Sequence, residues 1–189
     1  GINFRSFDDK SLNFQPIIIT EFLPHDLDTI LKDEQNCNVD HKWTPTKKYI
    51  CLLGIADGMR YIHGLNIIHG HLSPKCILID ENFHPKIMFP PYFSENYAEQ
   101  MEISAYLDPE LFYIQDESKI TPQSDVYSFA IIMNEILTEK SPYYEWKSND
   151  ICSMRLRIMN GKRPLMSDNV NAKMKSLISS CWKSFDEEQ

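Results

Sequence analysis

The sequence of 189 residues has no hydrophobic run that approaches the roughly 18 residues needed for a membrane-spanning helix. Its longest uncharged apolar stretches are residues 16–20 and 129–133. Positive charge is also scarce, because 19 Lys and Arg residues stand against 27 Asp and Glu residues, a formal net charge of −8. An acidic surface repels nucleic acid and anionic lipid. We therefore expect no membrane span and no nucleic-acid partner.

Cysteine spacings typical of a zinc site or a disulfide framework are missing as well. The cysteines are odd in number and include no C-x-x-C, which favours reduced intracellular thiols. There is no N-x-S/T sequon and no signal-peptide pattern, so a cytoplasmic location is expected. The sequence begins with Gly1, and we expect it to be cut at both ends from a longer protein. The five cysteines are Cys37, Cys51, Cys76, Cys152 and Cys181.

Glycine is rare too, and none of the six glycines forms the phosphate-binding pattern G-x-G-x-x-G. What the sequence does contain is apolar material, since 42% of its residues are hydrophobic and 12% are aromatic. That share is sufficient for a packed core, so wholesale disorder is not expected.

The first part of the sequence predicts strands over residues 2–7 and 16–22, followed by a short helix over 25–32. Thr44 and Pro45 have the pattern of a helix start, with an N-cap followed by proline at the first helical position. Gly64 is predicted to end this helix as a left-handed cap. Short strands or extended pieces are expected at residues 67–68, 76–79 and 86–88.

A second helix start is predicted at Thr121 and Pro122. Residues 126–137 are apolar nearly all round the helix, which is typical of a helix in the middle of a domain. Two more helices are predicted over 149–160, ending at Gly161, and over 170–183. The order is a few strands and then helices around one buried helix.

Several unusual residues, in a fixed order, resemble landmarks of the large lobe of a protein kinase. Residues 61–63 and 67–80 resemble the catalytic loop and the strand after it, for which the family pattern is H-R-D-L-K-P-x-N-I-L-L-D. Residues 86–91 fall where K-I-x-D-F-G belongs. The other landmarks are 106–110, similar to A-P-E; 124–130, similar to S-D-V-Y-S-F-G; and 160–164 with Cys181 and Trp182, similar to the tyrosine-kinase-like group.

The resemblance implies an α+β, protein-kinase-like fold. Residues 1–24 would be the last strands and hinge of the small lobe, and residues 25–189 a mainly helical large lobe, truncated at both ends.

The resemblance also assigns structural roles within that lobe. His69 would pack beneath the catalytic loop, and Asp125 would accept hydrogen bonds from the backbone of that loop. Glu110 would pair with an arginine beyond Gln189, so its carboxylate is expected to lack that partner, at a cost if buried. Trp182 would be a further structural landmark.

Four substitutions fall on positions that carry kinase chemistry. By resemblance, His71 stands at the general-base Asp, and Ser73 at the catalytic-loop Lys. Cys76 and Phe89 stand at the two metal-binding positions. Mg²⁺ prefers hard oxygen ligands, which neither a thiol nor a phenyl ring supplies. We therefore expect no intact catalytic residue, no metal site and no metal-dependent phosphoryl transfer.

Further departures, one in the catalytic loop and one after it, concern how the activation segment is held. Gly70 replaces the Arg that docks a phosphorylated segment in many kinases, and the prolines at 90 and 91 replace Phe-Gly, which stiffens the chain there. The segment still contains residues that another kinase could phosphorylate, although the added charge would lack its usual partner. They are Ser94, Tyr97, Ser104 and Tyr106.

The sequence contains two other candidate sites. Thr20, as gatekeeper, with Glu21, Leu23 and Leu78 would line an adenine pocket; no cofactor is predicted, but ATP binding without a metal stays open. Tyr143, Tyr144 and Trp146 form an aromatic group that suits either protein docking or, as we favour, ordinary packing.

A transition-metal site is a third alternative. His69 and His71, with Cys76 and His84, include competent ligands. The interpretation as substituted kinase positions is favoured, because the flanking residues match on both sides.

Together these observations predict a pseudokinase that acts through other proteins, either as a scaffold or as an allosteric partner of an active kinase. Two alternatives remain. One is a divergent active Ser/Thr or Tyr kinase with His71 as its base, and the other is a nucleotide sensor without turnover.

Overall fold

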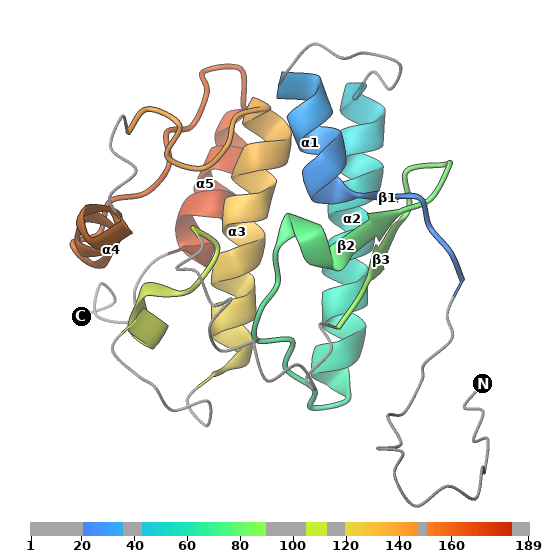
Figure 1. Cartoon of the computed structure of the whole chain (residues 1–189), viewed down its shortest axis with the longest axis horizontal. Coiled ribbons are helices and arrows are strands. Elements are labelled where there is room, and N and C mark those ends of the chain that lie inside the picture. Colours follow the sequence, from blue (N-terminus) through green and yellow to red (C-terminus); the bar gives the residue numbers. More distant parts are fainter. Residues whose placement is uncertain (1–20, 36–42, 90–104, 113–119, 147–150, 183–189) are drawn as a thin grey trace, which may run out of the picture.

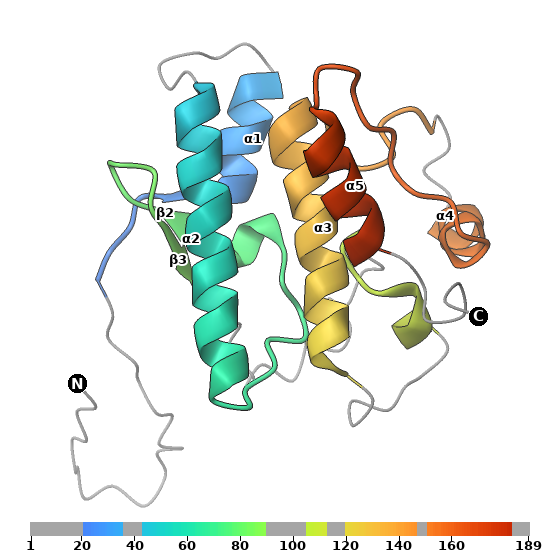
Figure 2. The same ribbon diagram turned by 180° about the vertical axis from the view of Figure 1, so that it is seen from behind.

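In the computed structural model of the protein, two long helices form the frame of the fold (Figures 1 and 2). They are α2, Pro45–Gly64, and α3, Pro122–Thr138. A salt bridge of 2.7 Å joins Lys48 near the start of α2 to Glu139 at the end of α3. At the other end of the pair, His63 of α2 bonds Asp125 of α3 at 2.8 Å. The two helices therefore lie side by side and run in opposite directions.

The structure describes residues 21–35, 43–89, 105–112, 120–146 and 151–182, and the statements below concern these residues. The predicted strands over 2–7 and nearly all of 16–22, together with Thr20, Pro90 and Pro91, lie outside them. No helix of the described residues is long and apolar enough to cross a membrane. The other elements are β1 His25–Asp26, α1 Leu27–Gln35, η1 Pro74–Cys76, β2 Ile77–Ile79, β3 Pro85–Ile87, η2 Pro109–Phe112, α4 Ile151–Met159 and α5 Ala172–Cys181.

Both predicted helix starts are confirmed. The Thr44 side chain accepts a hydrogen bond from the Lys47 amide, and Pro45 is the first residue of α2. The predicted left-handed cap at Gly64 is wrong, because Gly64 is still helical and the left-handed residue is Asn66, with φ 57°. Asparagine tolerates this conformation better than most side chains, which explains why the turn needs no glycine.

The small sheet is antiparallel throughout and has the order β1-β2-β3. Leu78 in the central strand pairs with Asp26 on one side and Lys86 on the other. The expected strands near 76–79 and 86–88 are present with shifted bounds, whereas residues 67–68 form no strand. Strand β1 was not predicted, because two polar residues carry no strand pattern of their own.

Two glycines let the sheet approach α2 closely. A Cβ on Gly54 would lie 2.5 Å from the Pro85 ring, and a Cβ on Gly58 would lie 2.8 Å from the end of the Ile87 side chain. Such separations are too short for ordinary contact, so helix and strand can pack this tightly only because both positions lack a side chain.

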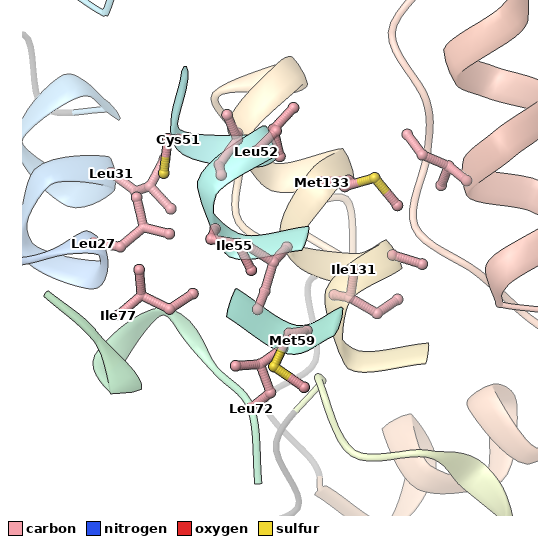
Figure 3. Packing of buried hydrophobic residues seen from close by; sticks show 14 of the residues in the cluster. Leu27, Leu31, Cys51, Leu52, Ile55, Met59, Leu72, Ile77, Ile131 and Met133 are labelled. Atoms are coloured by element: carbon pink, nitrogen blue, oxygen red, sulfur yellow. The ribbon is translucent and has the colours of Figure 1, made fainter. Parts of the chain in front are cut away.

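The core lies between α1, α2, α3 and β2 (Figure 3). Helix α3 is buried over most of its circumference, as predicted. Helix α5 covers another side of α3, and α4 lies at the edge of the molecule, where Figures 1 and 2 agree. Buried side chains that meet in this core include Leu27, Leu31, Cys51, Leu52, Ile55, Met59, Leu72, Ile77, Ile131 and Met133.

Candidate functional site

Asp125, near the start of α3, anchors the loop that follows α2. This residue is only 1% exposed. Its carboxylate accepts from the His69 amide at 2.9 Å and from the Gly70 amide at 2.8 Å. These are the hydrogen bonds that the resemblance implied. The His63 ring donates to the same carboxylate at 2.8 Å. One buried side chain thereby fixes the loop to both long helices.

Gly70 adopts a positive φ of 78°, a conformation that side chains with a Cβ rarely take. A Cβ built there would lie 3.3 Å from the Ile120 side chain. The backbone thus favours glycine at this position. A larger residue, such as the Arg of the family pattern, would be strained in the loop conformation seen here.

His69 is fully buried, and both of its ring nitrogens have partners. Nδ1 accepts from the His71 amide at 3.3 Å, and Nε2 contacts the Met88 carbonyl at 3.1 Å. Because Nδ1 accepts and Nε2 must donate, the ring is the neutral Nε2–H tautomer. Burial also lowers the pKa of His69. The residue is therefore a neutral packing element beneath the loop.

Ser73 and Cys76, expected at the catalytic-lysine and metal-binding positions, bond each other. Ser73 Oγ lies 3.6 Å from Cys76 Sγ, and Cys76 Sγ donates to the His71 carbonyl at 3.6 Å. Cys76 is buried at 8% exposure. The hydroxyl and the thiol thus make their hydrogen bonds within the loop.

Phe89, expected at the second metal-binding position, packs on the loop. Its ring stacks on His69 with centroids 4.9 Å apart and 24° between the ring planes. Within the described ranges, no group of three His, Cys, Asp or Glu side chains is placed to hold a metal ion. His69, His71, Cys76 and His84 therefore form no such group, and His84 bonds Asp80 at 3.3 Å.

The residues expected around an adenine are only partly described. Leu78 is half-buried in the central strand, and Leu23 is half-buried in the segment before β1. The Glu21 side chain forms an exposed ion pair of 3.3 Å with Lys86 of β3. This ion pair joins the segment before β1 to the sheet.

Glu110 lies in η2 and is exposed, so the expected cost of a buried carboxylate does not arise. Trp182, in contrast, is 6% exposed at the end of α5. Its carbonyl accepts from Arg163 Nε at 2.9 Å, and the guanidinium lies over the Tyr127 ring at 5.3 Å. Arg163 therefore ties the end of α5 to α3, a role that the motif alone did not reveal.

Tyr106 was expected among phosphorylatable residues, but its hydroxyl is held inside the protein. It donates to Glu135 Oε2 at 2.5 Å, while the Tyr106 carbonyl accepts from Ser128 at 2.7 Å. Burial raises the pKa of Tyr106 well above its ordinary value. In the described arrangement Tyr106 is thus not presented to another enzyme. Sequence reasoning missed Glu135, whose place within an apolar helix was the only signal.

The aromatic group after α3 serves packing, as favoured. Tyr143 is buried and stacks on Trp146 with ring centroids 4.3 Å apart, and only Tyr144 is exposed.

Comparison with known proteins matches residues 10–189 to the family described as protein tyrosine and serine/threonine kinase. RGS domain-containing serine/threonine-protein kinase A of Dictyostelium discoideum is 34% identical over 137 residues, 69% of this chain and 12% of that protein. Human receptor-interacting serine/threonine-protein kinase 1 is 33% identical over 157 residues, 70% of this chain and 22% of that protein. Mouse ankyrin repeat and protein kinase domain-containing protein 1 is 30% identical over 142 residues, 66% of this chain. The chain spans 12%, 22% and 18% of the lengths of these relatives.

Proposed function

We propose that this chain, which belongs to the protein tyrosine and serine/threonine kinase family, is a pseudokinase domain that retains the α+β kinase scaffold but does not transfer phosphate. The contact between Ser73 and Cys76 carries this proposal. Two positions that serve phosphate and metal in the family pattern here satisfy each other inside the loop.

The residues at the two metal-binding positions also support the proposal. Phosphoryl transfer in kinases depends on metal ions that neutralise charge on the phosphates. Cys76 offers sulfur, Phe89 offers no donor atom, and Mg²⁺ prefers oxygen. Loss of both ligands removes several kcal/mol of charge stabilisation from the transition state. Because each 1.4 kcal/mol of activation free energy corresponds to about a tenfold change in rate, phosphoryl transfer would slow by orders of magnitude.

A second candidate is a divergent active serine/threonine kinase. The names of the relatives favour it, and a neutral imidazole at His71 is able to accept a proton near pH 7. A well-placed general base contributes about 10²–10⁴ in rate. That contribution does not replace the metal ligands. We therefore rank this candidate lower.

The work left to such a domain is binding. The buried side chains of Asp125 and His69 hold the fold together. The surface of this fold can then bind other proteins, including an active kinase. Placement in the tyrosine-kinase-like group and a cytoplasmic location belong to the same proposal, which predicts no cofactor and leaves metal-free ATP binding to the thermal-shift experiment below. The motif at residues 160–164, with Cys181 and Trp182, supports the group assignment.

The deciding experiment compares phosphate transfer and nucleotide binding on the protein that carries this domain. With radiolabelled ATP, we expect no incorporation that depends on Mg²⁺ or Mn²⁺, either into the protein or into a general substrate. Incorporation that requires the metal and disappears in His71→Ala would establish the active-kinase alternative.

A thermal shift with ATP separates a scaffold from a nucleotide sensor. A scaffold shows no shift with or without Mg²⁺, whereas a sensor is stabilised equally in both conditions. A shift that requires Mg²⁺ would contradict both.

A further inference from the structure

Tyr106, in the short segment 105–112, forms two hydrogen bonds with side chains of α3. The Tyr106 hydroxyl donates to Glu135 at 2.5 Å, and the Tyr106 carbonyl accepts from Ser128 at 2.7 Å. Glu135 and Ser128 lie seven residues apart on α3, two turns along the same face. The segment lies beside α3 in Figures 1 and 2, drawn in yellow-green. The other end of the segment is held by α4, because the Phe112 carbonyl accepts from Arg155 Nη2 at 3.1 Å. The two bonds of Tyr106 therefore hold the first part of the segment on α3.

Glu135 stands where three elements meet, at 5% exposure. The ionisable groups that act on it are Tyr106 from the docked segment and Asp28 and Lys32 from α1. None of these groups lies on α2 or α5, the helices packed on other sides of α3. Lys32 is already paired with Asp28 at 2.7 Å, so the two α1 charges largely offset each other.

We propose that the Tyr106–Glu135 hydrogen bond is a proton-controlled latch. While Glu135 carries a proton, residues 105–112 stay docked on α3. When the proton is lost, the carboxylate is left buried with one strong donor, and undocking of the segment admits the water that solvates it. This device concerns docking and not catalysis, so it is independent of the proposed function.

Two effects on an ionised Glu135 oppose each other. A tyrosine hydroxyl bonds a carboxylate more strongly than a neutral acid, which favours the docked state. Burial disfavours the charge, which favours the open state. Burial is the larger effect, because it raises the pKa of Glu135 from an ordinary value of 4.5 to about 7, with the Tyr106 hydrogen bond acting in the opposite direction. The open segment is therefore favoured by loss of the proton.

The sign follows from linkage. A carboxyl with a raised pKa in the docked state supports docking fully below its ordinary value, and this support is lost as the pH rises through about 7. Within that window the docking equilibrium falls by at most about tenfold for each pH unit. Above it, docking stays low and no longer depends on pH.

Hydrogen exchange of the whole protein between pH 5 and pH 8, corrected for intrinsic exchange, tests the latch. We expect protection of residues 105–112 to fall several-fold across this range while protection within α3 stays constant. Glu135→Gln, which cannot ionise, should keep high protection at every pH. The matched exposed variant Glu81→Gln should behave like wild type.

Tyr106→Phe supplies the second test, because it removes the hydroxyl and keeps the ring. Protection of residues 105–112 should already be about fivefold lower at pH 5, the effect of one lost hydrogen bond. A pH step that persists in Glu135→Gln, unchanged protection in Tyr106→Phe, or an equal loss of protection throughout α3 would each overturn the latch.

Discussion

Phe89 stacks on His69, with ring centroids 4.9 Å apart and 24° between the ring planes. The aromatic side chain at a metal-binding position of the family thus packs against the loop that would carry the catalytic groups. His69 is fully buried, whereas Phe89 is 37% exposed and covers one face of its ring. The substitution therefore has a structural use as well as a chemical consequence.

Phe89→Leu keeps apolar bulk but removes the stacked ring. Aromatic pairs contribute about 0.5–1.5 kcal/mol beyond the area they bury, so we expect the free energy of unfolding to fall by that amount. Urea denaturation measures it, with the neighbouring exposed Met88→Leu as control, expected to change stability by less than about 0.5 kcal/mol. Equal effects of both substitutions would mean that the stack adds nothing.

Restoring oxygen ligands tests the metal argument directly. The double variant Cys76→Asn with Phe89→Asp returns the two family ligands, and we expect it to bind Mn²⁺ weakly in the presence of ATP. Neither single variant should bind, because one oxygen ligand from the protein is too few. Electron paramagnetic resonance of Mn²⁺ detects the bound ion. Binding by wild type at the same strength would show that other groups hold the metal.

Removal of the Asp125 carboxylate should be the most damaging change near the loop. Asp125→Ala leaves the buried His69 and Gly70 amides without their acceptor, at about 1–3 kcal/mol each, so a loss of about 3–5 kcal/mol is expected. Asp125→Asn keeps one acceptor oxygen and should lose less. Chemical denaturation gives both values, with exposed Asp168→Ala as control. A loss below about 1 kcal/mol in the alanine variant would refute the anchoring role.

Much of the helical frame could be predicted from local sequence. Thr44 and Thr121 are each followed by proline, and this two-residue pattern predicts the helix starts. The apolar run in α3 predicts that this helix is buried. Strand β1 could not be predicted, because its two residues become a strand only by pairing with Ile79 and Leu78, more than fifty positions away.

In the candidate site, too, the sequence predicts what a motif carries but not the contacts between residues far apart in the chain. The resemblance placed Asp125 beneath the loop, since its motif carries that role. The bonds from His63 to Asp125 and from Tyr106 to Glu135 join residues 62 and 29 positions apart. No periodicity links such pairs, so only the packing of α2, α3 and the segment 105–112 reveals them. The Ser73–Cys76 contact is local, yet it depends on the turn of η1.

The glycines of α2 should respond to alanine with opposite signs. Gly64→Ala meets no atom within 4 Å and should stabilise the protein by about 0.5–1 kcal/mol through helix propensity. Gly54→Ala meets the rigid Pro85 ring at 2.5 Å, and overpacking of about 1–3 kcal/mol should outweigh the same gain. Gly58→Ala meets the movable end of Ile87 and should fall between them. Thermal melts rank the three variants, and any other order would contradict the close helix–strand approach.

The neutral state of His69 should make the protein sensitive to acid. Burial lowers its pKa below the ordinary 6.5, so its contribution to stability is complete above pH 6.5 and is lost as the pH falls through the lowered value. The slope is at most about 1.4 kcal/mol for each pH unit. The stability contribution of Glu135 changes with pH in the opposite direction between about pH 4.5 and pH 7. The test therefore compares two variants that both carry Glu135→Gln, one with His69 and one with His69→Gln. From pH 7.5 to pH 4.5, the unfolding free energy of the Glu135→Gln variant should decline more steeply than that of the double variant with His69→Gln, because glutamine does not titrate. Parallel curves would mean that the His69 ring accepts a proton in the folded protein without cost.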